Sequence, residues 1–303
     1  MTKPKPHNSS RVAVVTGATG GIGSELADQL AAQNWTLVLV NRSRERSESL
    51  LAELKRSYPA VDVTLFYADL LDVESIREVV KQITEAFPSI DLLVNNAGLL
   101  SRDAVAAPSG LDHHAQVNTI APILLTFGLR GSLKSAAMES GRSVAITTSS
   151  GAISMGPPLV ADELRRPTKP GLFGSYPQSK LAAAVAYQRL ADEFLKDGIE
   201  LYSIDPGGNR TAMTSGPAAP FFVRWGKRLL PHPRVGASKL LKPIDTGWDI
   251  APGSFVSGGK AKALPRKKLT ESEIGRTLDL IAEQVARFDP DIDASAAFQT
   301  EKA

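Results

Sequence analysis

The sequence contains no cysteine, has a net charge of only +3 and shows no long apolar run. Without cysteine, disulfides, thiolate metal sites and cysteine nucleophiles are excluded, and a reducing compartment is favoured. The small net charge gives no reason to expect a nucleic-acid partner. Residues 1–10 are polar, and no segment reaches the roughly 18 apolar residues that cross a bilayer. These absences favour a soluble, cytoplasmic protein.

What is present is enough apolar sequence for one large folded domain. Of the 303 residues, 43% are hydrophobic and 22% are charged, so a sizeable core can be buried. Strand-like and helix-like segments alternate six times, which predicts an α/β fold with a doubly wound parallel sheet and helices on both faces. We expect this domain at residues 11–288, with flexible tails at 1–10 and 289–303.

The first unusual motif is rich in glycine and runs from Thr16 to Gly23. It follows a β-branched strand at residues 11–15 and precedes a helix with a regular apolar stripe. In that setting, Gly17, Gly21 and Gly23 would let the backbone approach a pyrophosphate at the helix N-terminus. The alternative is a plain turn between strand and helix.

The second strand, residues 35–40, ends at Asn41 and Arg42. Dinucleotide folds that prefer NAD often carry a carboxylate here, which bonds the ribose 2′-hydroxyl. No carboxylate is present, whereas Arg42 is available to pair with a 2′-phosphate, and two further arginines follow. The sequence therefore favours NADP(H) over NAD(H), although a solvated basic helix start at 43–57 is the alternative.

Further polar or glycine-containing sets follow the later strands. They are Asp69-Leu70, Asn95 to Gly98, Ser150-Gly151 and Pro206-Gly207. Ligands of doubly wound sheets lie beyond the carboxyl ends of the strands, where these sets would meet. The coincidence predicts one ligand site at that edge. Asp72 is expected to cap the helix that spans residues 73–86.

A long helix is expected from Leu111 to about Ser140, with Pro122 kinking it. His113 and His114 are adjacent and no third ligand stands at metal spacing, so we interpret both as exposed and expect no metal site. Asn118 lies on a mostly apolar stretch of this helix, where a buried amide needs hydrogen-bond partners.

Tyr176 and Lys180 are four residues apart, so on a helix they lie on one face. A nearby ammonium favours the phenolate, so Lys180 is expected to lower the pKa of Tyr176 and make it a usable general acid and base. Pro177 is tolerated only in a first helical turn, which places Tyr176 at the entrance of its helix. In isolation, the same spacing is also typical of two surface residues.

Taken together, the motifs resemble those of the short-chain dehydrogenase/reductases over roughly residues 11–256. The resemblance implies a seven-stranded Rossmann sheet and a catalytic tetrad of Asn118, Ser150, Tyr176 and Lys180. Tyr176 would exchange a proton with the carbonyl or alcohol oxygen, Ser150 would bond that oxygen, Lys180 would hold the nicotinamide ribose, and Asn118 would hold a relay water. The expected cofactor contacts are Gly17, Thr19, Gly21, Ile22, Gly23, Asn41, Arg42, Asp69, Leu70, Asn96, Ala97, Gly98, Tyr176, Lys180, Pro206, Gly207 and Thr211.

Two features depart from the commonest members of this family. Ser150 and Tyr176 lie 26 positions apart, about twice the usual gap, and Pro177 directly follows the tyrosine. The longer insertion and the Asn41-Arg42 pair resemble the retinol-dehydrogenase-like and protochlorophyllide-reductase-like branch. That resemblance implies NADP(H) and a lipophilic carbonyl or alcohol as substrate.

The segment at about 212–246 occupies the place of the family's substrate loop. Phe221 and Trp225 share a helical face there, which favours a lid over an apolar substrate, with Ser150 and Tyr176 as the other substrate contacts. A membrane-surface contact or a homo-oligomer interface is the alternative for this segment. We therefore expect an NADP-dependent oxidoreductase. The alternatives are a non-catalytic NADPH-binding sensor or scaffold, and an epimerase or dehydratase on the same fold.

Overall fold

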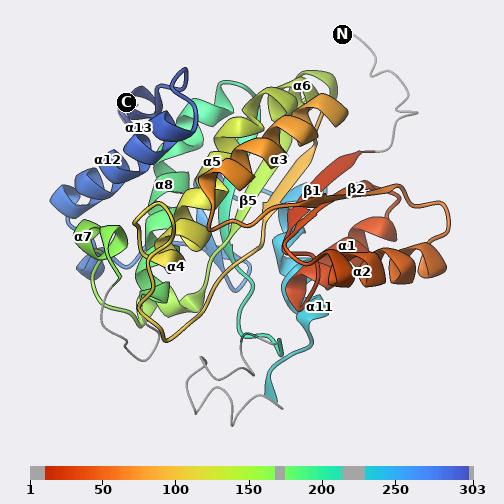
Figure 1. Ribbon diagram of the computed structural model, residues 1–303, viewed down its shortest axis with the longest axis horizontal. Coiled ribbons are helices and arrows are strands. Elements are labelled where there is room, and N and C mark those ends of the chain that lie inside the picture. The colour runs from red at the N-terminus through yellow and green to blue at the C-terminus, as the bar shows by residue number, and fades with distance from the viewer. Residues whose placement is uncertain (1–10, 168–174, 212, 214–228, 300–303) are drawn as a thin grey trace.

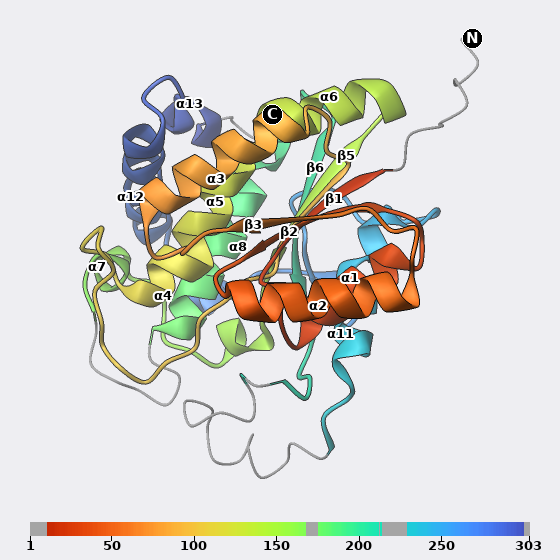
Figure 2. The same cartoon turned by 45° about the vertical axis from the view of Figure 1, so that its right-hand side comes forward.

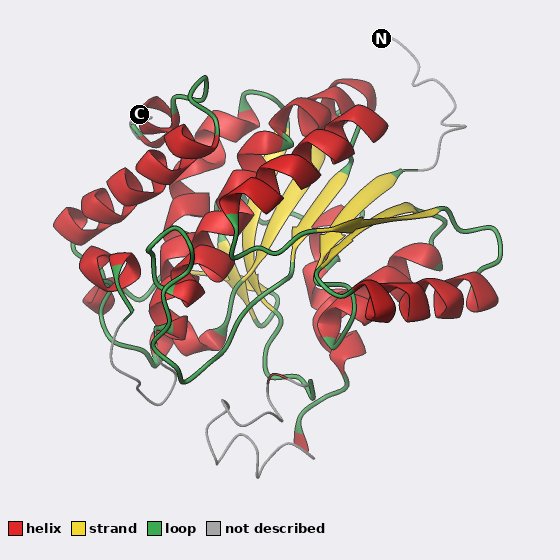
Figure 3. Ribbon diagram, viewed as in Figure 1, coloured by secondary structure: helices red, strands yellow, loops and turns green. Residues whose placement is uncertain are grey.

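The computed structural model describes residues 11–167, 175–211, 213 and 229–299. Over these residues the chain forms three layers, with one twisted sheet between two layers of helices (Figures 1 and 3). The predicted tail at 1–10 lies outside the described residues, as do Phe221 and Trp225 of the expected lid.

The described strands form one sheet of eight, in the order β3-β2-β1-β4-β5-β6-β7-β8. The strands are β1 (Val12–Thr16), β2 (Thr36–Asn41), β3 (Val63–Tyr67), β4 (Leu92–Asn95), β5 (Ser143–Thr148), β6 (Ile199–Asp205), β7 (Phe255–Ser257) and β8 (Lys260–Lys262). The first seven run parallel, and the doubly wound α/β fold is confirmed. Because the chain winds outward from β1 and then crosses to β4, the order reverses at that pair, where such sheets bind ligands.

The eighth strand is an addition to the seven that the resemblance implies. It pairs antiparallel with β7 through a two-residue hairpin turn. Gly258 and Gly259 form the turn with φ angles of 63° and 76°, a conformation that glycine adopts without strain. The Gly258-Gly259 pair is therefore the feature of the sequence that indicates the β7–β8 hairpin.

Helices cover both faces of the sheet (Figure 2). One face carries α1 (Ile22–Ala31), α2 (Arg44–Ser57) and α11 (Pro233–Leu240). The other carries α3 (Val73–Ala86), α5 (Ala121–Gly128), α6 (Arg130–Ser140), α8 (Tyr176–Leu195) and α12 (Glu271–Phe288). Short elements complete the described chain: α4 (His113–Ala115), α7 (Ala161–Arg165), α13 (Ala294–Phe298), a π-helix at Gln116–Ile120, and 3₁₀ turns at Gly151–Ser154, Lys242–Ile244 and Arg266–Lys268.

Each helical layer encloses its own apolar core against the sheet. Leu26 and Leu30 of α1 pack on Leu37 of β2 on one face, whereas Ile123 of α5 and Leu190 of α8 lie in the core on the other. Strands with both faces covered read as continuous apolar runs, as Leu37 to Val40 does. Among the described helices, none has the length and apolarity needed to cross a membrane.

The helix expected at 111–140 is divided into several pieces. A π-helix at Gln116–Ile120 precedes α5, and Pro122 occupies the first turn of α5, where its missing N–H costs nothing. A further break at Leu129 separates α5 from α6, which ends at Gly141 as expected. The kink predicted at Pro122 is therefore a change of helix type just before it.

The C-terminal segment differs from the flexible tail expected at 289–303. Residues Ala294–Phe298 form α13, and Ala297 and Phe298 are buried against the core beside α12 and α8. Asp293 caps this helix by accepting a hydrogen bond from the amide of Ala296 at 3.0 Å. The expectation of a flexible tail does not hold at Ala294–Phe298, because three apolar residues in so short a segment can be recognised as buried only when their partners are known.

Candidate active site

A cleft of about 630 Å³ opens at the carboxyl ends of the parallel strands. Most of the expected site residues line it. They are Gly17, Thr19, Gly21, Ile22, Asn41, Arg42, Asp69, Leu70, Asn96, Ala97, Gly98, Ser150, Tyr176, Lys180, Pro206, Gly207 and Thr211. Gly23 and Asn118 do not line the cleft themselves. Gly23 packs against Gly17 and Asn118 bonds Leu99, and both of these partners line the cleft. The structure thus brings together residues spread over nearly 200 positions of the chain.

The glycine loop is held in contact with the end of β4 by close backbone packing. Gly17 has a φ of 67°, and a Cβ on it would lie 2.9 Å from the Cα of Ala97. A Cβ on Gly23 would overlap the carbonyl oxygen of Gly17. The amide of Asn96 donates from Nδ2 to the carbonyl oxygens of Thr16 at 3.0 Å and Gly17 at 3.2 Å. Glycine is therefore required sterically, and the loop forms a backbone cradle at the N-terminus of α1 that fits a pyrophosphate.

Asn41 and two arginines line the cleft where β2 ends. Asn41 is 3% exposed, and neither polar atom of its amide meets a hydrogen-bond partner among the described residues. Arg42 and Arg46 both line the cleft and are exposed. Arg44 lies elsewhere, with its guanidinium 4.0 Å above the ring of Tyr67. Unpartnered amide atoms and two solvated guanidinium groups fit the ribose and phosphate of an adenine dinucleotide.

Arg46 was not among the expected cofactor contacts. Ser43 caps α2 by accepting a hydrogen bond from the amide of Arg46 at 3.4 Å, so Arg46 occupies the third helical position. The cap at Ser43 is the sequence feature that could have identified Arg46 as a cleft residue. It determines which residues of the first turn of α2 face the end of β2.

Lys180 and Tyr176 are both buried in the wall of the cleft. Lys180 is 3% exposed and donates from Nζ to the carbonyl oxygen of Thr148 at 2.7 Å. Burial lowers the pKa of Lys180 to about 8. Burial also raises the pKa of Tyr176, which a hydrogen bond with Ser150 opposes and the charge of Asp205 reinforces.

The expectation that Lys180 lowers the pKa of Tyr176 is not met in this structure. The pKa of the phenol is shifted upward, and burial is the largest cause. The physical reason is that desolvation penalises the phenolate, while the lysine ammonium is bonded to the carbonyl oxygen of Thr148. The group that lowers the phenol pKa is Ser150.

Asn118 is fully buried in the π-helix and has protein partners for its amide. Its Nδ2 donates to the carbonyl oxygen of Leu99 at 2.9 Å and to Oγ of Ser179 at 3.0 Å. Its Oδ1 accepts from the amide of Leu99 at 2.8 Å. A Cβ on Gly98 would lie 3.3 Å from Oδ1 of Asn118 and 3.5 Å from Nζ of Lys180, so the two groups flank Gly98. The relay water expected at Asn118 stays a prediction.

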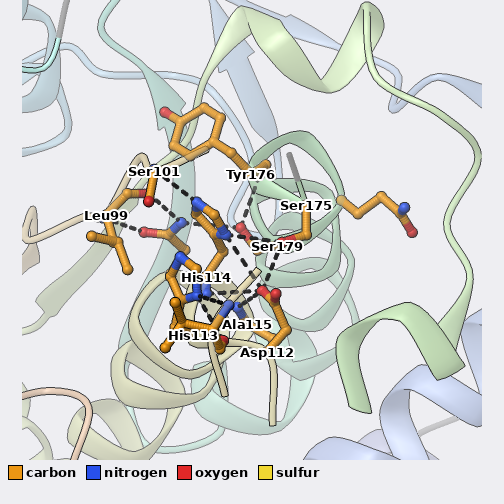
Figure 4. Close-up of polar contacts among 12 residues, drawn as sticks. Leu99, Ser101, Asp112, His113, His114, Ala115, Ser175, Tyr176 and Ser179 are labelled. Carbon is orange, nitrogen blue, oxygen red and sulfur yellow. Dashed lines mark hydrogen bonds and ion pairs between the residues drawn. The ribbon is translucent and has the colours of Figure 1, made fainter. Parts of the chain in front are cut away.

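His113 and His114 are buried, which corrects the expectation that they are exposed. They are 3% and 1% exposed, and their rings are 4.1 Å apart. Together with Asp112 they offer ligand atoms within 4.8 Å of one another, the spacing of a metal site. Oδ1 of Asp112 instead caps α4, accepting from the amides of His114 at 2.9 Å and Ala115 at 3.2 Å (Figure 4). The pair is covered because residues 101–111 fold back over it, with a bridge between Ala106 and Asp112.

Several apolar residues of the cleft wall were also missed. They are Leu99, Leu100, Val117, Met155 and Met213. Met155 comes from the insertion between Ser150 and Tyr176, and Leu99 and Leu100 follow the asparagine motif directly. Leu99, Leu100 and Met155 lie outside regular helices and strands, so no periodic pattern marks them. Val117 lies in the π-helix, within an apolar stretch where nothing singles it out.

Comparisons with known proteins show which proteins are similar to this chain in sequence and in fold. A family model described as short chain dehydrogenase matches residues 11–219. Polyprenol dehydrogenase of Mus musculus is 30% identical over 287 residues, which cover 90% of this chain and 83% of the relative. Retinol dehydrogenase 11 of Homo sapiens is 30% identical over 260 residues, covering 82% and 77%.

A solved structure agrees with the fold. A short chain dehydrogenase of Shigella flexneri 2a, complexed with NADP, has a TM-score of 0.58 at 26% identity and covers 74% of this chain and 86% of its own. The family model, the relatives and the strand-end cleft lead to one assignment: this chain belongs to the short-chain dehydrogenase/reductase family of oxidoreductases, in its retinol-dehydrogenase-like branch.

Proposed function

We propose that the protein is an NADP(H)-dependent oxidoreductase that interconverts a carbonyl and an alcohol on a bulky, lipophilic small molecule. The observation that supports this most is the wall of the cleft. There, Ser150, Tyr176 and Lys180 line the same cleft as the glycine cradle. A hydroxyl, a phenol and an ammonium beside a dinucleotide cradle are the groups that carbonyl reduction needs.

The bound nicotinamide would supply or accept the hydride. The phenol of Tyr176 would give a proton to the carbonyl oxygen during reduction, and would take it from the alcohol during oxidation. The hydroxyl of Ser150 would donate a hydrogen bond to the same oxygen as charge develops on it. Lys180, held at the carbonyl oxygen of Thr148, would reach the nicotinamide ribose.

The preference for NADP(H) is proposed from Asn41, Arg42 and Arg46. Two guanidinium groups lie at the cleft where β2 ends, and the solved relative from Shigella flexneri carries NADP. Substituting Arg42 or Arg46 by alanine should reduce the preference for NADPH over NADH about tenfold, because each loses a charge-assisted hydrogen bond. Arg44→Ala is the matched control: it stacks on Tyr67, so it should leave the ratio unchanged.

A lipophilic substrate is proposed from the apolar wall of the cleft and from the relatives. Leu99, Leu100, Val117, Met155 and Met213 line it, and two relatives are named for retinol and polyprenol. The lid expected at 212–246 is not supported over its last part, because α11 and Leu241 are buried against α1 and the sheet. We therefore propose a lid for residues 214–228 alone, which lie outside the described residues, with a membrane-surface or homo-oligomer contact as the alternative use. A cytoplasmic or peripheral location accompanies this proposal.

The proposed reaction is tested with a panel of lipophilic aldehydes and ketones and NADPH. Tyr176→Phe should lower turnover about 100- to 10,000-fold, because the proton donor is lost, while NADPH affinity stays within about twofold. Full activity in that variant would contradict the mechanism. Tight NADPH binding without turnover of any carbonyl would instead indicate a sensor or scaffold. Substrate conversion without stoichiometric NADPH consumption would indicate an epimerase or dehydratase.

A further inference from the structure

Two parallel sets of buried hydrogen bonds join the loop after β4 to the entrance of α8. In the first set, Asn118 bonds both backbone groups of Leu99 and donates to Oγ of Ser179. Ser179 in turn donates from Oγ to the carbonyl oxygen of Tyr176 at 2.8 Å. One amide side chain thus connects a residue of the cleft wall to the backbone of the residue proposed as the proton donor.

The second set is centred on His114 (Figure 4). The amide of Ser101 donates to Nε2 of His114 at 3.0 Å, so this nitrogen carries no proton. The other ring nitrogen, Nδ1, then carries the proton and donates to Oγ of Ser175 at 2.9 Å. Ser175 donates from its hydroxyl to Oδ1 of Asp112 at 2.7 Å. Every polar hydrogen in this set has an acceptor.

The two sets are equivalent by position on their elements. His114 in α4 and Asn118 in the following π-helix are four residues apart, and so are Ser175, which directly precedes α8, and Ser179 within it. The two sets are therefore about one helical turn apart on both segments. His114, Asn118 and Ser179 are 1%, 0% and 0% exposed. Tyr176 lies between the two serines, and its ring meets the His114 ring edge to face, with centroids 6.4 Å apart.

We propose that His114 is a positioning residue that fixes Tyr176 relative to the cleft wall at Leu99 to Ser101. This inference rests on the proposed function, because it assigns His114 a part in placing the proton donor against the substrate. Asn118 forms one hydrogen-bonded bridge, here called a brace, between the cleft wall at Leu99 and Ser179 of α8. His114 forms a second brace one helical turn away, between Ser101 and Ser175. With one brace alone, the entrance of α8 could rotate about it, whereas two braces fix both distance and orientation.

A metal site is the other use of Asp112, His113 and His114, and their hydrogen bonds argue against it. Both ring nitrogens of His114 and Oδ1 of Asp112 have protein partners. In this trio, Nε2 of His113 lacks a partner among the described residues. A metal would have to break the contact that connects Ser101 to Ser175, whereas the braced arrangement keeps both hydrogen bonds of the His114 ring.

The test compares three variants with the wild-type protein. His114→Phe keeps a ring of similar shape and removes both hydrogen bonds. His114→Gln keeps one donor and one acceptor and is the rescue variant. His113→Phe is the matched control: its ring is equally buried, but its hydrogen bonds go to the backbone of Val105 and not to α8. Each variant is measured for kcat and KM with NADPH and a lipophilic ketone, NADPH affinity, thermal stability, and amide hydrogen exchange at Ser101.

The expected result is a loss specific to His114→Phe. Its kcat should fall about 10- to 100-fold, because small displacements of a proton donor have effects of this size, while NADPH affinity stays within about twofold. The Ser101 amide should exchange faster, and His114→Gln should recover most of kcat. Equal loss of kcat in His113→Phe and His114→Phe would reduce the role to structure alone and overturn the inference, as would unchanged kcat in His114→Phe.

The proposed oxidoreductase function and the proposed positioning role of His114 can be contradicted independently of each other. Should the wild-type protein turn over no carbonyl with NADPH, the proposed function fails, and exchange at the Ser101 amide decides whether the brace exists. Faster exchange in His114→Phe than in His113→Phe would support the brace, and equal exchange would overturn it.

Discussion

The two sides of the cleft hold their residues by different kinds of contact. On the glycine side, which comprises residues 17–23 with Asn96 and Ala97, backbone packs directly on backbone, and Gly17 cannot carry a side chain beside Ala97. On the tyrosine side, which comprises 99–101, 112–118 and 175–180, side chains such as His114 and Asn118 bridge separate segments by hydrogen bonds. The glycine side therefore depends on the absence of side chains at Gly17 and Gly23, with Asn96 bonding the loop's carbonyl oxygens. The tyrosine side depends on polar side chains that bridge separate segments.

This difference indicates how each side should respond to change. A close backbone contact has no alternative arrangement, so any added atom displaces it as a whole. A hydrogen-bonded bridge loses one contact at a time, and the remaining bridge continues to hold the segment. Substitutions on the glycine side should consequently abolish binding, whereas those on the tyrosine side should reduce turnover in steps.

The largest effect is expected for Gly23→Val on the glycine side. Its side chain would overlap the carbonyl oxygen of Gly17, so NADPH affinity should fall about 100-fold or more, which corresponds to about 2.7 kcal/mol. Titration of protein fluorescence with NADPH measures this. Gly275→Ala in α12 is the control, because no atom lies within 4 Å of its added Cβ. Affinity unchanged in Gly23→Val would contradict the steric account of the loop.

The second effect concerns Gly156→Val, which would disturb the tyrosine side through Pro177. A Cβ on Gly156 would overlap the ring of Pro177, which directly follows Tyr176, so the phenol should be displaced. We expect kcat/KM to fall about 10- to 100-fold. NADPH affinity should remain within about twofold, since the glycine side is untouched. A matching loss of NADPH affinity would show that the two sides are not separable.

The third effect concerns stability, at Lys180. Its pKa is lowered from 10.5 to about 8, so below pH 8 the folded state carries a buried ammonium that costs about 3 kcal/mol. The unfolded chain binds more protons between pH 8 and 10.5, and this contribution therefore raises stability as pH rises through that window. Lys180→Met should unfold at higher urea concentration at pH 7 and lose this contribution to the pH dependence. Lower stability of the methionine variant at pH 7 would refute the burial account.

The smallest effect is expected for a residue outside both sides of the cleft. Asp72 caps α3 by accepting a hydrogen bond from the amide of Glu74 at 3.1 Å. Asp72→Ala should reduce the free energy of unfolding by about 1 kcal/mol, measured by urea denaturation. Turnover and NADPH affinity should not change, which sets the baseline for remote substitutions. An altered KM for NADPH would show that the N-terminus of α3 affects cofactor binding in the cleft.

Elements with a local signal were predictable in detail. The expected helix at 73–86 and its cap Asp72 are confirmed, and α2 begins after Ser43 as its sequence indicates. The additional strand β8 was missed, although Gly258 and Gly259 signalled its hairpin. The helix expected at 111–140 failed for a different reason, because an uninterrupted apolar pattern does not distinguish an α-helix from a π-helix followed by two helices.

The sequence by itself determined that Gly17, Arg42, Asn96 and Ser150 would share one cleft, whereas Tyr176 was placed there by the family resemblance. Parallel strands end at the same edge, so residues that follow successive strands meet whatever the details of packing. Only the tertiary structure decided that His113 and His114 are buried and that His114 connects Ser101 to Ser175. Those contacts depend on a loop folding back over a short helix and on α8 arriving beside it, and such non-local packing leaves no periodic trace in the chain.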